Sequence, residues 1–324
     1  MASIRDIKRR IKSVSNTKKI TKAMEMVAAA KMRKAVEAVL KTRTYSNLSW
    51  ETVMHISRMA NGNTSDLHPL LSKRGEVKNV AIILITSNRG LCGSFNAAII
   101  NKAHNSIKKH EISQGGGKVG TDVILIGKKG ESIRFFGYQI AADFPKLDIV
   151  SEVVEVIPVA RMVIEDYLSG KYDKVMVAYT DFISAAKQVP RVKQLLPIEI
   201  SSEDEYLGIV GKDTRIGLDK EFLMDKSEKH LTSDEYEYEY AFEPSPRQVL
   251  DEMIPRLIEV QLFQALLESN ASEHSARMAM MHQATDAAND MVNELTLFYN
   301  KARQAGITNE IAEISAGADA LKES

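Results

Sequence analysis

The glycine-bearing stretch Arg89-Gly-Leu-Cys-Gly-Ser94 is the part of the sequence most suggestive of chemistry. It follows an apolar run, and a turn of this kind before a helix can hold an anion on backbone N–H groups. Its two glycines are three residues apart and no third follows, so the dinucleotide-binding fingerprint is absent. Gly115-Gly-Gly-Lys118 lacks the spacing and the hydroxyl residue of a Walker phosphate loop. We therefore favour a tight turn with a structural or partner-facing role, and an anion cradle is the alternative.

The other reactive side chains form no catalytic or metal-binding pattern. Cys92 is the only cysteine, which excludes an intramolecular disulfide and a four-cysteine zinc site. No His–Asp pair accompanies it, so we expect a small buried thiol. The seven histidines are scattered, and His274 and His282 are predicted to lie at or near a helix seam. The sequence therefore predicts no catalytic residue, no metal site and no cofactor.

Charge is balanced over the whole chain but uneven along it. Residues 1–43 carry 13 Lys and Arg against 3 Asp and Glu, a net charge of +10. Residues 201–243 carry 13 acidic against 5 basic side chains, a net charge of −8. The basic stripe could meet DNA phosphates, but no aromatic residue precedes Tyr45. We therefore favour a solvated or partner-facing stripe over nucleic-acid binding.

The final third of the chain, from about Pro246 to Leu321, predicts one long helix. Ser245 is the expected N-cap, with Pro246 in the first helical position. Steps of four and three alternate without a slip, which keeps one seam facing a partner helix. A helix of roughly 55 residues would be about 80 Å long, so it needs a partner. Bending or fraying is expected at Pro255 and Gly306. The seam positions are Leu267, Ala271, His274, Met278, Met281, Thr285, Ala288, Val292, Leu295, Tyr299 and Ala302.

Residues 2–60 predict a second long helix. Its narrow apolar stripe and charged remainder are typical of a coiled-coil strand, and a surface helix of a larger domain is the alternative. The four-three pattern slips near Thr17 and then resumes. The stripe consists of Ile4, Ile7, Ile11 and Val14 before the slip, and of Ile20, Met24 and Val27 after it.

The segment between the two helices alternates strands and helices, which predicts a small α/β domain with a mostly parallel sheet. Apolar runs predict buried strands at 80–85, 122–126 and 174–179, and a short strand at 139–142. Gln194–Ile200 is predicted as an edge strand. Helices are expected at about 94–111, 128–136 and 153–168, the last bent by Pro158 or beginning there. An acidic excursion follows, with an edge strand at 236–242.

The resulting division is a coiled-coil helix at 1–60, a Rossmann-like α/β domain at 76–200, the excursion at 201–243 and a coiled-coil helix at 244–324. If the terminal helices pair along their length they must be antiparallel, which predicts a rod with a globular foot. The longest apolar run is about a third of a membrane span, and the N-terminus has no signal-peptide core. We expect a soluble or partner-tethered coiled-coil binding protein. The alternatives are a nucleotide-dependent α/β enzyme and a coiled-coil nucleic-acid scaffold.

Several segments of this chain resemble the gamma subunit of F-type ATP synthases. They match in order and spacing over the whole chain except the acidic excursion. The matching segments are Ile11-Lys-Ser-Val-Ser-Asn-Thr-Lys-Lys-Ile-Thr-Lys-Ala-Met-Glu-Met-Val-Ala-Ala-Ala-Lys-Met-Arg33, Ser87-Asn-Arg-Gly-Leu-Cys-Gly93, Gln194-Leu-Leu-Pro197, Glu243-Pro-Ser-Pro246, Ala271-Ser-Glu-His-Ser-Ala-Arg-Met278, Ala284-Thr-Asp286, Tyr299-Asn-Lys-Ala-Arg-Gln-Ala305 and Glu310-Ile-Ala-Glu-Ile314.

This resemblance implies the central rotor shaft of a proton- or sodium-driven ATP synthase. The coiled coil would sit inside a ring of three alpha and three beta subunits, and the α/β domain would bind the epsilon subunit and the c-ring. Catalysis would lie on the beta subunits, whose acidic lever segment suits a basic helix. The resemblance places rotor–stator contacts at Met24, Arg256, Arg303 and Gln304, with Pro255 a departure from the family pattern beside Arg256.

Two further departures bear on these expectations. The acidic stretch 201–240 is longer than in compact members of the family, and the thiol pair of redox-regulated chloroplast forms cannot exist with Cys92 alone. No transit peptide is evident. We therefore expect a bacterial protein, peripheral to the inner membrane on its cytoplasmic side and held there indirectly through the c-ring.

Overall fold

The computed structural model describes residues 4–59, 68–72, 74–75, 77–113, 120–147, 152–198, 243 and 245–322, and their side chains except those of 43–59, 110–113, 246 and 317–322. The acidic excursion, with the strand expected at 236–242, lies outside the described residues. The chain divides into two compact units. Met1–Ala29 and Arg277–Ser324 form unit 1, and Ala30–Ala276 form unit 2. The long helices α1 (Ile4–Met59) and α5 (Pro246–Lys322) contribute to both units.

Unit 2 is built on a five-stranded sheet in the order β3-β2-β1-β4-β5. Four strands pair in parallel, and β5 pairs antiparallel with β4 at the edge. The prediction of a mostly parallel α/β sheet is therefore confirmed. The strands are β1 (Asn79–Ile85), β2 (Gly120–Ile126), β3 (Gln139–Phe144), β4 (Lys174–Phe182) and β5 (Gln188–Leu196).

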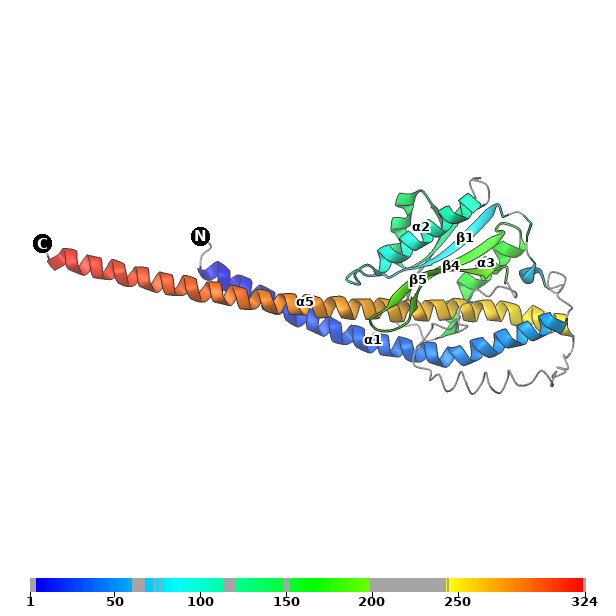
Figure 1. Cartoon of the computed structure of the whole chain (residues 1–324), viewed down its shortest axis with the longest axis horizontal. Helices are drawn as coiled ribbons and strands as arrows, with labels where there is room; N and C mark the ends of the chain where they lie inside the picture. Colours follow the sequence, from blue (N-terminus) through cyan, green and yellow to red (C-terminus); the bar gives the residue numbers. More distant parts are fainter. Residues whose placement is uncertain are drawn as a thin grey trace. The chain divides into compact units, whose positions relative to one another are not determined.

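Helices cover both faces of this sheet (Figure 1). Alternate residues of β1 point to opposite faces, so the strand is buried on both sides, as its continuous apolar run predicts. Ile82 packs with α2 (Phe95–Ser113) and the 3-10 helix η3 (Lys128–Phe136). Ile83 belongs to the larger core on the other face, with α3 (Ile157–Leu168) and the first part of α5. The sheet is thus the middle of three layers.

Two predicted element boundaries need correction. The helix expected at 153–168 does not begin at Val153, where there is a single 3-10 turn, η4 (Val153–Glu155). It begins as α3 with Pro158 in its first turn, so the alternative of a start at this proline is confirmed. Proline fits there because the first N–H groups of a helix have no partner within it. The edge strand is confirmed as an edge but runs over β5, six residues earlier than expected at its start. Pro190 is tolerated within β5 because an edge strand leaves one side of its ladder unpaired.

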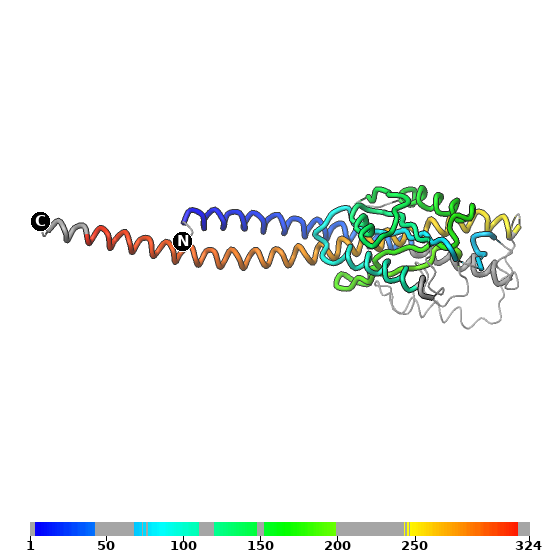
Figure 2. Tube along the Cα trace, turned by 90° about the horizontal axis from the view of Figure 1, so that it is seen from above, coloured from blue at the N-terminus to red at the C-terminus, as the bar shows by residue number. Residues whose placement is uncertain are grey.

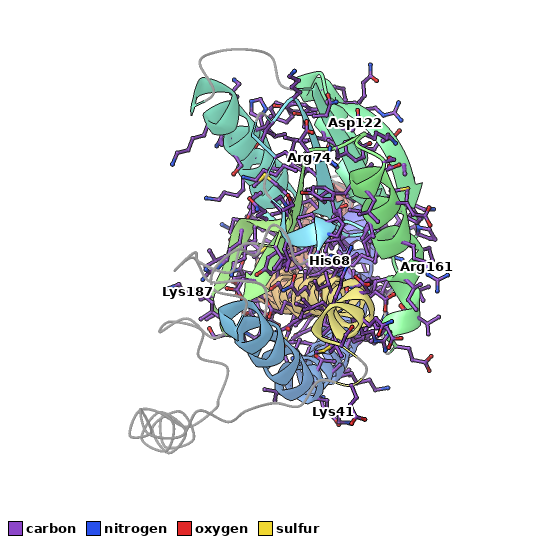
Figure 3. The ribbon with its side chains drawn as sticks, turned by 90° about the vertical axis from the view of Figure 1, so that its right-hand side faces the viewer. Lys41, His68, Arg74, Asp122, Arg161 and Lys187 are labelled. Carbon is purple, nitrogen blue, oxygen red and sulfur yellow. The ribbon has the colours of Figure 1, made fainter. Side chains whose placement is uncertain are left out.

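The start of β1 is tied to the rest of unit 2 by Arg74 and Asp173. The Asp173 carboxylate accepts N–H bonds from Lys78 and Asn79, each 2.9 Å, and lies 3.1 Å from an Arg74 nitrogen. Arg74, which Figure 3 labels, also donates to the Tyr167 carbonyl at 2.6 Å and lies over the Tyr167 ring. Burial opposes the charged carboxylate, but the bonds from Asn79, Lys78 and Arg74 outweigh it and hold the pKa of Asp173 below its ordinary value.

Unit 1 is an antiparallel pair of helices formed by the first part of α1 and the last part of α5 (Figure 2). Residue numbers rise along one helix as they fall along the other. Lys18 bonds Asn289 and Thr21 bonds Thr285, while Ile4 reaches to within 3.5 Å of the position that a Cβ on Gly306 would occupy. The predicted antiparallel coiled coil is confirmed within this unit.

The seam predicted on α5 is confirmed, whereas the slip predicted on α1 is wrong. Every α5 seam position from Leu267 to Ala302 is buried or half-buried. On α1, Ile20 and Val27 are 60% and 56% exposed, so they are not seam residues. The inward positions instead continue without a slip through Ile7, Ile11, Val14, Lys18, Thr21, Glu25 and Ala28.

Polar residues can occupy this α1 seam because α5 offers them partners. Lys18 Nζ donates to Asn289 Oδ1 at 2.6 Å, and the hydroxyl oxygens of Thr21 and Thr285 are 2.8 Å apart. A search for apolar residues alone skips these positions and creates an apparent slip. Counting the heptad onward from Val14, whatever the residue type, would have found them.

Candidate functional site

The paired helices of unit 1 carry a line of charged contacts beside their seam. Lys22 bonds Glu25 at 3.0 Å, and His282 Nδ1 lies 3.4 Å from the same carboxylate. The Lys22 hydrogen bond is the main reason that the pKa of Glu25 lies below its ordinary value. His282 Nε2 also lies 3.6 Å from Asp286. These contacts are exposed, so they fix the pairing of the helices more than they stabilise it.

The outward faces of the same helices expose many large apolar side chains. Single exposed apolar residues are ordinary, but a series along one helical pair indicates a surface that meets a partner. Several are more than half exposed, and they occur on both helices. The exposed residues are Ile4, Ile20, Met26 and Val27 on α1 and Met291, Leu297, Phe298, Ile307, Ile311 and Ile314 on α5.

The four residues expected at rotor–stator contacts lie in both units. Met24 is half-buried next to the α1 seam. Arg303 and Gln304 are exposed on α5 just before Gly306, the residue that lies beside Ile4 of α1. Arg256 belongs to unit 2, where it is exposed and its guanidinium bonds Glu259 at 2.7 Å. The α5 helix continues through the neighbouring Pro255 without a break. The structure thus places three of these residues on the helical pair and one outside it.

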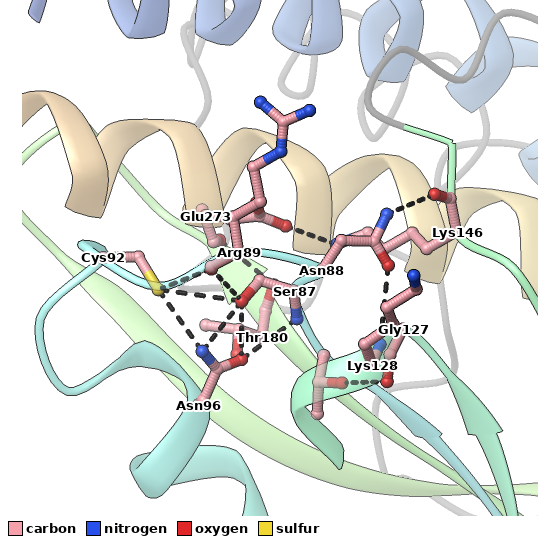
Figure 4. Close-up of polar contacts among 12 residues, drawn as sticks. Ser87, Asn88, Arg89, Cys92, Asn96, Gly127, Lys128, Lys146, Thr180 and Glu273 are labelled. Atoms are coloured by element: carbon pink, nitrogen blue, oxygen red, sulfur yellow. Dashed lines mark hydrogen bonds and ion pairs between the residues drawn. The ribbon is translucent and has the colours of Figure 1, made fainter. Parts of the chain in front are cut away.

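The turn between β1 and α2, where the sequence suggested an anion cradle, is held together internally (Figure 4). The Ser87 N–H donates to Asn96 Oδ1 at 3.0 Å, and the Phe95 N–H donates to the Cys92 carbonyl at 3.3 Å. Leu91 has a φ of 62°, the left-handed region that a tight turn requires. Because the N–H groups of Ser87 and Phe95 are already bonded within the turn, they are not available to an anion, which is consistent with a structural role.

Cys92 lies inside this turn as the predicted buried thiol. It is 2% exposed, and its sulfur accepts a hydrogen bond from Asn96 Nδ2 at 3.3 Å. Within the part of the chain that the structure describes, no three His, Cys, Asp or Glu side chains are grouped so that they could hold a metal ion. None of the described helices is long and apolar enough to cross a membrane.

Sequence reasoning missed a buried ion pair in unit 2. Lys146 Nζ lies 2.6 Å from Glu273 Oε2, and both side chains are almost fully buried. Lys146 follows β3 and Glu273 belongs to α5, so 127 positions separate them in the chain. The sequence offers no spacing signal for such a pair. The burial of Glu273 could have been suspected only if this stretch of α5 were known to be covered on all sides, which its sequence does not show.

The comparisons with known proteins point to one family. A family model described as ATP synthase matches residues 3–321. The ATP synthase gamma chain of Heliobacterium modesticaldum is 42% identical over 324 residues, covering 99% of this chain and all of the relative. That of Herpetosiphon aurantiacus is 42% identical over 330 residues, covering both chains completely.

Solved structures show the same fold. A chain of the Euglena gracilis mitochondrial ATP synthase, in the structure of its OSCP, F1 and c-ring, superposes with a TM-score of 0.58 at 18% identity, covering 98% of this chain and 94% of that chain. A chain from the rotor of the same enzyme has a TM-score of 0.55 at 17% identity, covering 94% and 98%.

The helical pair exposes an apolar surface and is joined to a mostly parallel α/β domain in which we find no catalytic arrangement among the described residues. This combination is typical of a coiled-coil subunit of a larger assembly. The chain belongs to the ATP synthase gamma chain family. Members are the non-catalytic rotor subunit of the central stalk, and ATP is made and hydrolysed on the beta subunits. Membership sets aside both the nucleotide-dependent enzyme and the nucleic-acid scaffold.

Proposed function

We propose that the helical pair of unit 1 is the surface on which the rotor bears against the alpha and beta subunits. The observation that carries this proposal is the series of exposed apolar side chains on both helices. Exposure of apolar side chains to water is energetically unfavourable, and a surrounding ring of subunits would bury them. Leu297 and Phe298, at 71% and 60% exposure, lie midway along the α5 part of the series.

The coupling works through contacts that differ between the states of a catalytic subunit. A shaft can bias a beta subunit only if it contacts one conformation better than another. Two unlike helices present a different surface to each of three beta subunits at every angle. The basic stripe of α1 suits an acidic segment on beta. Met24, Arg303 and Gln304 make specific contacts with the catalytic ring from the helical pair, and Arg256 makes one from the part of α5 in unit 2.

The remaining segments take roles at the other end of the machine. The α/β domain at 76–200 binds the epsilon subunit and the c-ring, and the helices at 1–60 and 244–324 carry rotation from it to the catalytic ring. The excursion at 201–243 is a separate segment. Proton or sodium flow turns the c-ring. The chain is peripheral to a bacterial inner membrane, on its cytoplasmic side, and is held there through the c-ring.

Reconstitution tests this function directly. Mixed with the cognate alpha and beta subunits, the chain should form a complex with strong ATPase activity, and failure to co-assemble would contradict the proposal.

The bearing surface is tested by Leu297→Ser with Phe298→Ser, which should weaken assembly because it removes the apolar contact. Phe135→Ser is the matched control, since Phe135 is 92% exposed but lies on η3 of unit 2. Equal assembly of both variants would show that the surface is not at the interface.

A further inference from the structure

Lys146 and Glu273 form the most buried of the ion pairs described above for units 1 and 2. The Lys146 and Glu273 side chains are 2% and 6% exposed, and their charged atoms are 2.6 Å apart. Removing two charges from water costs so much that apolar residues of the same size often give equal or greater stability. Stability alone is therefore a weak reason for this pair. What a buried ion pair supplies in addition is a fixed relative position of the two elements that carry it.

The turn between β1 and α2 positions the lysine (Figure 4). Asn88 Nδ2 donates to the Lys146 carbonyl at 2.5 Å, and Asn88 Oδ1 accepts from the Lys128 N–H at 3.4 Å. The ring of Phe95, the first residue of α2, lies 5.9 Å from Lys146 Nζ. The hydrogen-bonded geometry of the turn thus has a use outside it, because it fixes the backbone from which Lys146 reaches α5.

Polar contacts on either side of Glu273 hold the same stretch of α5. The Ser272 hydroxyl donates to the Thr180 carbonyl near the end of β4, at 3.1 Å. The Ser275 hydroxyl donates to the Ala185 carbonyl in the β4–β5 turn, at 2.7 Å. Both serines are completely buried. Apolar surfaces can slide over one another with little change in energy, whereas hydrogen bonds and ion pairs have preferred distances and directions. This part of α5 is therefore held against both sliding and rotation about its axis.

The position of these contacts along α5 is as informative as their chemistry. Glu273 lies just before Arg277, where the compact unit that contains the α/β domain gives way to unit 1. Glu273 and Ser275 are among the last residues of α5 that contact the α/β domain. Any twist that the α/β domain imposes on α5 must pass this point before it reaches the helical pair.

We propose that the Lys146–Glu273 pair is the torque-bearing contact between the α/β domain and α5. This inference rests on the rotor function of the family. Asn88 acts as a positioning residue that holds Lys146 in place. When the α/β domain is turned, the pair and its flanking serine contacts keep α5 turning with it, so that less of the rotation is lost as slip or twist within unit 2.

The test is to replace the ion pair by apolar residues of similar size, Lys146→Met with Glu273→Leu, in the complete synthase. The folded chain should assemble and hydrolyse ATP at close to the normal rate, because an unloaded shaft needs little torque. ATP-driven ion pumping per ATP hydrolysed should fall several-fold in vesicles that already carry an opposing gradient. In the complex of this chain with its alpha and beta subunits, a rod attached to Lys108→Cys on α2 should show wider angular fluctuations while catalysis is arrested.

The control is Arg74→Met with Asp173→Leu, which removes another ion pair of unit 2. Its hydrogen-bond partners among the described residues are Lys78, Asn79 and Tyr167, none of which belongs to α5. The control variant should lower stability but leave the pumping ratio and the angular fluctuations unchanged. Lys146→Arg keeps the charge and should retain most of the stiffness. If the apolar double variant fails to assemble, Glu273→Gln takes its place, with the same direction of change expected.

Two results would overturn the inference. One is normal angular stiffness and a normal pumping ratio in either assembled Glu273 variant. The other is an equal loss in the Arg74–Asp173 control, which would mean that general destabilisation is the cause. Failure of the unaltered chain to drive rotation would count against the rotor function itself, and is distinguishable because it precedes any substitution.

Discussion

The hydroxyl oxygens of Thr21 and Thr285 lie 2.8 Å apart between the two helices of unit 1, and both side chains are buried. Each hydroxyl also lies within hydrogen-bonding distance of a carbonyl of its own helix, Lys18 for Thr21 and Met281 for Thr285. The pair therefore joins the two backbones through side chains that are satisfied locally. It fixes which turn of α1 lies against which turn of α5.

Valine substitutions at these two positions test that relationship. Thr21→Val or Thr285→Val alone should lower the free energy of unfolding by about 1 kcal/mol, because one hydroxyl is left facing a methyl group. The double variant should recover most of this loss, since both polar groups are then replaced by apolar groups of the same shape. Denaturant unfolding of the full chain, followed by helical circular dichroism, measures the difference. Strictly additive losses would contradict a direct bond between the threonines.

Met24→Lys tests the proposed contact of α1 with the catalytic ring. The added cation would lie next to the basic stripe that we propose faces an acidic partner segment. It should therefore hold one state of that segment too tightly. We expect ATP hydrolysis to persist while ATP-driven ion pumping falls. Met24→Leu is the matched control, because it conserves volume without adding charge. Normal pumping by the lysine variant would remove Met24 from the proposed set.

Alanine at Arg303 and Gln304 tests the contact near the end of α5. Both side chains are exposed in the chain alone, so the free energy of unfolding should change by no more than about 0.5 kcal/mol. The ATPase activity of the assembled complex should nevertheless fall several-fold. Lys301→Ala, an exposed cation on the same helix, is the control. A loss of activity that is equal in all three variants would point to a general effect of altering this part of α5 instead of specific contacts.

His68 predicts a pH dependence of stability. Its Nδ1 accepts the Leu70 N–H at 3.1 Å, and its Nε2 lies 3.4 Å from Asp251. Burial lowers the pKa of His68 below its ordinary value of 6.5, against the opposing effect of Asp251. The folded state thus prefers neutral His68. Its contribution to stability is fully present above the unfolded pKa and is lost as pH falls through the folded pKa.

His68→Asn is the variant that checks this assignment. Asparagine can accept the same N–H bond but does not titrate, so unfolding measured between pH 8 and pH 5, about one and a half units either side of the ordinary histidine pKa, should show a smaller decline than in the unaltered chain. His68→Ala should be less stable at every pH because it removes the acceptor of the Leu70 N–H at the start of the 3-10 helix Pro69–Leu71. An unchanged decline in the asparagine variant would assign the pH dependence to another group.

Much of the fold could be predicted because its pattern is local. The seam from Leu267 to Ala302 follows from heptad spacing, and the buried strands follow from apolar runs with no polar side. Errors arose where tertiary partners override residue type. Lys18 and Thr21 occupy the α1 seam because Asn289 and Thr285 satisfy them. The heptad count gives their positions, but not the partners that make polar residues acceptable there.

The candidate site was predictable only in part, for the same physical reason. The apolar residues Ile20 and Val27 look like seam residues by type, and only an uninterrupted heptad count from Val14 places them on the exposed face. The Lys146–Glu273 pair depends on how a loop after β3 meets a helix more than a hundred residues later. Contacts of this kind have no sequence period, so pattern reasoning cannot find them.

The last part of α5 continues beyond Gly306, which lies opposite the first described residue of α1. Ile307, Ile311 and Ile314 are exposed there on a helix that the described part of α1 does not reach. This segment continues a helix that is already nucleated, but no packing against the described part of α1 supports it. Assembly would therefore bury apolar side chains here and stabilise this end of α5. Its calorimetric signature would be a larger negative heat-capacity change than the rest of the interface accounts for.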